Sequence, residues 1–127
     1  MQNHTNVDNQ IFILMEIEKK SVKIYDCPVT YCMSKIGGKW KPIILFLISK
    51  GVNRFGEMQR GIDGISKQML TKQLRELEKD NILHREIFAE IPPRVEYTIT
   101  EHGHTLFPII QQMRDWGQEH MPQEIEA

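Results

Sequence analysis

Apolar residues recur at helical spacing through the first half of the chain. The first helix is predicted to start at Asp26-Cys27-Pro28, with proline in its first turn, and to stop at Gly37-Gly38. A second helix is predicted from Lys41 to Lys50, and its central residues 43–48 are apolar all round, which indicates burial. A third, short helix is predicted from Phe55 to Ile62.

The fourth predicted helix, residues 67–79, has one apolar face and one hydrogen-bonding face. Ser66 precedes it as an N-cap, and Asp80-Asn81 ends it, because asparagine tolerates the left-handed conformation. At about 100° per residue, the leucines lie together on one side and the polar residues on the other. The apolar face holds Leu70, Leu74 and Leu77; the polar face holds Gln68, Thr71, Lys72 and Arg75.

Two strands are predicted after this helix. Residues 82–88 form the first, and apolar residues alternate with polar ones from Val95 to Ile99 in the second. The connection from Ala89 to Arg94 is too long for a tight two-residue turn. It contains Pro92-Pro93, which cannot donate to a ladder, so a stiff, projecting loop is expected.

A last helix is predicted with Thr98-x-x-Glu101 as its capping signal and a kink at Pro108. Its apolar stripe extends well past the strands, and little chain remains to cover it. An apolar face without an internal partner usually packs on another subunit, which predicts a homodimer. The stripe consists of Leu106, Ile109, Ile110, Met113 and Trp116.

Charge is distributed unevenly in a chain whose net charge is −1. The segment from Lys35 to Arg75 contains nine basic and two acidic residues, whereas the segment from Glu76 onward contains eleven acidic and four basic residues. The middle segment therefore carries +7 and the last −7. A polyanion is a suitable partner for the middle segment, although scattered lysines are also typical of solvated helix faces.

Composition narrows the class of protein. The 127 residues suit one compact domain, and two cysteines are too few for a disulfide framework, so a reducing, cytoplasmic setting is expected. No apolar run is long enough to span a bilayer, and no membrane role is expected. The chain has no phosphate loop, zinc signature or nucleophile motif, so neither an enzyme nor a bound cofactor or metal is predicted.

The order of elements, three helices followed by a fourth with a polar face and then a hairpin, predicts an α+β, mainly α, winged helix-turn-helix with a two-stranded wing. Such a fold binds double-stranded DNA. The helix from Ser66 fits the major groove, where Gln68 or Arg75 can bond base edges. Arg94 at the loop tip is a candidate for minor-groove or backbone contact. The full set of predicted DNA-binding residues is Arg54, Ser66, Lys67, Gln68, Thr71, Lys72, Arg75 and Arg94.

Several motifs together resemble the HxlR family of bacterial regulators over about residues 25–120. They are Cys27-Pro28 to Ile36-Gly37-Gly38-Lys39-Trp40, Arg54-Phe55-x-Glu57-Met58, Gly64-Ile65-Ser66 to Leu77, Pro92-Pro93-Arg94-Val95-Glu96-Tyr97 and Trp116-Gly117. The resemblance implies a winged-helix dimer paired through N- and C-terminal dimerisation helices, with Pro92 to Arg94 as the wing tip. Residues 1–24 form an N-terminal extension that matches nothing specific, and 121–127 form a C-terminal tail.

Cys27 lies at a helix N-terminus, where the helix dipole favours a thiolate, while Asp26 opposes it. The Cys27 position is similar to the sensing thiol of family members that respond to quinones, aldehydes or disulfide stress, so redox sensing is one hypothesis. The other is a small buried apolar residue. The effector is thus either a thiol-reactive electrophile or a non-covalent small ligand, and a winged-helix module that binds a protein stays the alternative to a DNA-binding regulator.

Overall fold

The computed structural model describes residues 9–10 and 26–123, so most of the N-terminal extension and residues 124–127 lie outside the described part. The chain divides into two compact units, residues 1–35 and 36–127. Helix α2, Pro28–Ile36, is the main element described in the first unit, and its last residue belongs to the second. It begins with the predicted proline, and the Cys27 carbonyl accepts the Tyr31 N–H (2.9 Å) in its first turn.

Three helices open the second unit, close to the predicted bounds: α3, Lys41–Ser49, α4, Phe55–Gly61, and α5, Lys67–Lys79. Gly64 has a φ of 85° in the turn between α4 and α5, a conformation that favours glycine. Asn81, after α5, has a φ of 59°, which confirms the predicted left-handed stop. The core of the unit is apolar and includes Ile44, Leu45, Met58, Leu70, Leu74, Leu77, Ile82 and Leu83.

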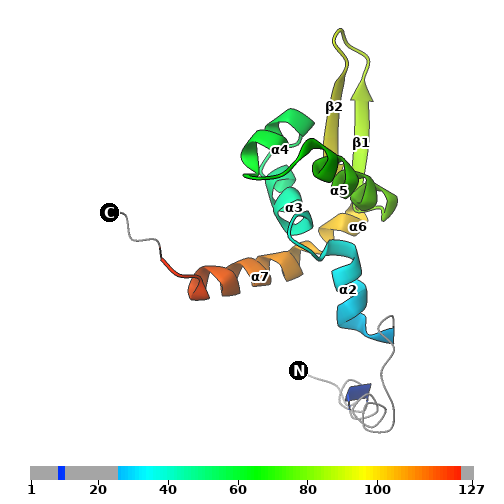
Figure 1. Ribbon diagram of the computed structural model, residues 1–127. Coiled ribbons are helices and arrows are strands. Elements are labelled where there is room, and N and C mark those ends of the chain that lie inside the picture. The colour runs from blue at the N-terminus through cyan, green and yellow to red at the C-terminus, as the bar shows by residue number, and fades with distance from the viewer. Residues whose placement is uncertain (1–8, 11–25, 124–127) are drawn as a thin grey trace. The chain divides into compact units, whose positions relative to one another are not determined.

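The predicted wing is a two-stranded antiparallel sheet of β1, Leu83–Phe88, and β2, Arg94–Ile99. Its ladder runs from the Leu83–Ile99 pair to the Phe88–Arg94 pair, which leaves residues 89–93 as the tip. The Tyr97 N–H donates to the Asn53 carbonyl (3.0 Å), so β2 is also bonded to the segment before α4. The wing projects beyond α4 and α5 (Figure 1).

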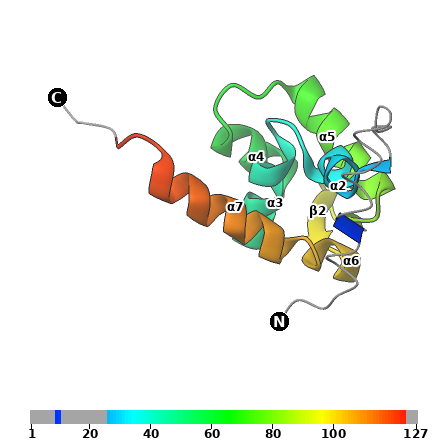
Figure 2. The ribbon, with the colours of Figure 1, turned by 90° about the horizontal axis from the view of Figure 1, so that it is seen from below.

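The C-terminal segment differs from its prediction in two respects. Thr98 lies inside β2, and the cap is Thr100, whose hydroxyl oxygen accepts the Gly103 N–H (2.9 Å) at the start of α6, Glu101–His104. Pro108 does not kink one helix; it lies in the first turn of a separate helix, α7, Phe107–His120. Proline suits a helix start, where its missing N–H has no partner to lose. Figure 2 shows α6 and α7 in succession.

Helix α7 leaves most of its apolar stripe uncovered within its unit. Ile110 is buried, but Ile109, Met113 and Trp116 are exposed, and the C-terminal half of α7 extends away from the other helices of the unit (Figures 1 and 2). Among the described residues, no helix is both long and apolar enough to cross a membrane.

Candidate nucleic-acid interface

Helix α5 is held at its start by a cap and along one side by the core. The Ser66 hydroxyl oxygen accepts the Met69 N–H (3.0 Å), which satisfies one of the backbone donors that a helix N-terminus leaves open. Leu70, Leu74 and Leu77 are fully buried. Because these leucines fix the rotation of the helix, the opposite side faces outward.

The outward side of α5 gathers five of the predicted DNA-binding residues around one open hollow of about 470 Å³. Their side chains offer ammonium, guanidinium and amide donors. The Thr71 hydroxyl already donates to the Lys67 carbonyl (2.8 Å), so toward a ligand it is placed to accept. Lining the hollow are Lys67, Gln68, Thr71, Lys72, Arg75 and one residue that was not predicted, Glu76.

Glu76 forms an ion pair with Lys41, the first residue of α3, across 2.7 Å. The hydrogen bond from Lys41 lowers the pKa of Glu76. Lys41 is the one buried charged residue of the part described here, and the pair joins α3 to α5. The sequence gives no sign of this pair, because Lys41 and Glu76 are 35 positions apart and each fits an ordinary surface pattern.

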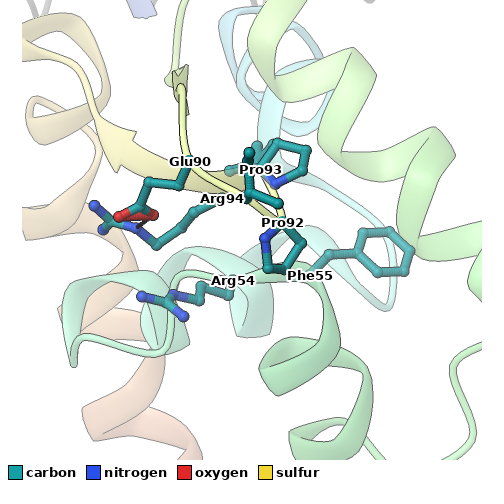
Figure 3. A pocket seen from close by; sticks show the side chains of 8 residues that line it. Arg54, Phe55, Glu90, Pro92, Pro93 and Arg94 are labelled. Atoms are coloured by element: carbon teal, nitrogen blue, oxygen red, sulfur yellow. Dashed lines mark hydrogen bonds and ion pairs between the residues drawn. The ribbon is translucent and has the colours of Figure 1, made fainter.

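The other two predicted basic residues, Arg54 and Arg94, lie at the wing. Arg54 precedes α4, and its guanidinium is 3.4 Å from Glu96 on β2. Arg94 donates to Glu90 (2.8 Å) and to Glu96. Arg54, Glu90 and Arg94 border a second open hollow, about 760 Å³, between the start of α4 and the wing tip (Figure 3). The structure thus places Arg54 and Arg94 together, in a different hollow from the α5 residues.

Cys27 lies just before α2, in the first unit, as a free, half-buried thiol. Hydrogen bonds from the backbone N–H and the hydroxyl of Thr30, and from the Val29 N–H, lower its pKa. All three donors belong to the first turn of α2. A lowered pKa increases the thiolate fraction at neutral pH, and the thiolate is the nucleophilic form.

Three helices, a capped fourth helix with a basic face, and a hairpin wing define a winged helix-turn-helix protein. A family model described as HxlR-like helix-turn-helix matches residues 35–125, and the chain belongs to this family of transcriptional regulators.

Relatives agree with this assignment. The HTH-type transcriptional regulator YdeP of Bacillus subtilis (strain 168) is 45% identical over 104 residues, which cover 82% of this chain and 81% of YdeP. The structure of the redox regulator HypR in its oxidized form is 46% identical and superposes with a TM-score of 0.72 over 78% of this chain and 100% of HypR. Diamide-treated YodB from B. subtilis is 34% identical, with a TM-score of 0.62 over 76% of this chain and 97% of YodB.

Proposed function

We propose that the chain binds double-stranded DNA sequence-specifically, with α5 in the major groove. The observation that carries the proposal is the outward side of α5, where Lys67, Lys72 and Arg75 flank polar side chains opposite a fully buried leucine face. Base edges in the major groove present donors and acceptors to which Gln68 and Arg75 can each make bidentate hydrogen bonds. The phosphate oxygens can accept hydrogen bonds from the lysines. The Ser66-capped N-terminus of α5 adds a favourable site for a phosphate.

The test separates base contacts from phosphate contacts. Fluorescence anisotropy with DNA from the protein's own upstream region measures the affinity of the wild type, Arg75→Ala and Lys72→Ala. Arg75→Ala is expected to weaken the preferred sequence more than others, whereas Lys72→Ala weakens all sequences alike. Lys50→Ala, an exposed lysine at the end of α3, is the matched control and leaves binding unchanged. Unchanged binding in both α5 variants would refute the assignment of α5.

We also propose that the protein acts as a homodimer whose interface includes α7. Ile109, Met113 and Trp116 share one face of α7, and Trp116 is 65% exposed. Met113→Asp is expected to give a monomer in analytical ultracentrifugation, because a charge on this face would have to be buried. Gln118→Asp, exposed on the opposite side of α7, is the control and stays dimeric. A dimeric Met113→Asp protein would contradict this interface.

The effector proposal rests on Cys27, whose thiol has a lowered pKa at the start of α2. Two structural relatives bear the names of a redox regulator and of a diamide-treated protein, which supports a thiol-stress signal. The second cysteine, Cys32, lies within α2 and is also a free thiol. We expect a thiol oxidant or a quinone to change DNA affinity in the wild type and in Cys32→Ser, but not in Cys27→Ser. Tight binding that treatment leaves unchanged would assign the signal elsewhere, without affecting the α5 proposal.

A further inference from the structure

The end of the wing presents one fully exposed apolar side chain. The β1–β2 ladder ends at the Phe88–Arg94 pair, and the five residues beyond it form the tip. Ile91 has its whole surface in water, with a relative exposure of 102%, and Pro92 and Pro93 beside it are exposed. Because it is fully exposed, the Ile91 side chain adds nothing to the apolar core and is accessible to a partner.

Arg94, the first residue of β2 and the neighbour of the tip, is engaged within the wing. The Arg94 guanidinium donates to Glu90 (2.8 Å) and to Glu96, and it lies over the Phe88 ring, 3.8 Å from the ring centroid. Its side chain is only 27% exposed. Figure 3 shows the Glu90 carboxylate against the Arg94 guanidinium. A new contact to phosphate would compete with two carboxylates already in place.

Charge in this part of the wing cancels. Glu96 also lies 3.4 Å from Arg54, so two arginines are balanced by two glutamates. The Tyr97 N–H to Asn53 carbonyl bond holds the same region of β2 to the segment before α4. The network therefore fixes the direction of the wing but brings no net positive charge to its tip.

We propose that the wing contacts the DNA minor groove through the apolar side chain of Ile91, and that Arg94 is a positioning residue that holds the tip. This rests on the proposed DNA-binding function of α5. DNA is the occupant that the tip fits: the minor groove is only about 6 Å wide, and it admits apolar side chains that wedge against base steps. A stable protein interface needs roughly 800 Å² per partner, far more than one isoleucine and two prolines offer.

The test compares Ile91→Ala with wild type by anisotropy at several salt concentrations. We expect affinity to fall at least about tenfold, because even partial burial of the lost carbons, counted in both subunits, gives that factor, and we expect the salt slope to stay unchanged. Hydroxyl-radical footprinting should show weaker minor-groove protection beside the α5 site. Ile87→Ala, an exposed isoleucine on the body of β1, is the matched control and should behave as wild type. Ile91 makes no core contact, so the variant should keep its melting temperature.

The role of Arg94 is tested by the double variant Glu90→Gln with Arg94→Gln, which leaves the net charge of the network of two arginines and two glutamates at zero. A positioning role predicts weaker binding with an unchanged salt slope. A salt slope that becomes shallower by about 0.9 for each wing would show that Arg94 contacts phosphate and would overturn the proposal.

The remaining outcomes are also decisive. An Ile91→Ala protein that binds as tightly as wild type, while Arg75→Ala is weakened, refutes the wing contact and leaves the proposed function standing. A wild type that binds no DNA refutes both.

Discussion

The two partners of the Lys41–Glu76 ion pair are unequally exposed to solvent. Replacing one partner should therefore lower the free energy of unfolding more than replacing the other. The Lys41 side chain is 9% exposed, the Glu76 side chain is 40% exposed, and the charged atoms are 2.7 Å apart. Without Glu76, the Lys41 ammonium stays nearly buried with no counter-charge. Without Lys41, the Glu76 carboxylate is solvated where it is. We predict that Glu76→Ala destabilises the fold more than Lys41→Met does.

The magnitudes follow from this asymmetry. Breaking a fully buried pair costs about 3–5 kcal/mol, and an exposed pair contributes about 0.2–1 kcal/mol. Because water reaches one end of this pair, we expect about 2 kcal/mol for Glu76→Ala. Lys41→Met keeps the length of the buried stem and removes its charge, so we expect less than about 1 kcal/mol. In the double variant the buried charge is gone, and the cost should be close to that of Lys41→Met alone.

Thermal and urea unfolding at one fixed protein concentration measure these differences. About 2 kcal/mol corresponds to a melting temperature lowered by roughly 8 °C in a chain of this size. Since Lys41 lowers the pKa of Glu76, its contribution is present above the unfolded value of about 4.3 and is lost as the pH falls through the lowered folded value. The gap between wild type and Glu76→Ala should therefore shrink below about pH 4. A Lys41→Met variant that is less stable than Glu76→Ala at pH 7 would refute this account.

Three further predictions concern packing, capping and thiol reactivity. Gly103→Ala would force a Cβ into the Ile82 carbonyl oxygen, so we expect a loss of about 3 kcal/mol in urea unfolding. Gly61→Ala, whose Cβ would meet nothing nearer than 3.7 Å, should change stability by less than about 1 kcal/mol. Equal effects of the two substitutions would contradict the packing of α6. Ser66→Ala should cost about 1 kcal/mol through loss of the α5 cap, and no change in denaturation midpoint would argue against that cap. Iodoacetamide labelling of Cys27, followed by peptide mass spectrometry, should show a rate midpoint below the ordinary thiol value of about 8.5; a midpoint at or above it would contradict the lowered pKa.

Much of the fold can be predicted from local signals. Ser66 followed by the spaced leucines defines α5 to the residue, because a cap and an apolar stripe are both short-range features. The cap of α6 could not be assigned correctly, since Thr98 and Thr100 both suit a helix start and strand pairing decides between them. Pro108 shows the same limit: proline permits a kink or a new start, and the choice depends on how the chain packs.

The candidate site shows what periodicity cannot reveal. Helical spacing placed Gln68, Lys72 and Arg75 on one side of α5, as the structure has them. It gave no sign that Glu76 is paired with a buried lysine from another helix. Nor did it show that Arg94 is engaged by two glutamates, because those interactions arise only once the hairpin closes.

The central claim, that α5 carries a DNA-binding face, is tested most directly by the salt dependence of binding. Anisotropy with DNA from the protein's own upstream region, titrated from low to physiological salt, gives the slope of log affinity against log salt. A dimer that neutralises on the order of 8 phosphates predicts a slope near −7, and replacing Lys72 by Ala should make it shallower by about 0.9 in each subunit. Binding that is absent, or whose slope Lys72→Ala leaves unchanged, would contradict the account and favour a winged-helix module with a protein partner.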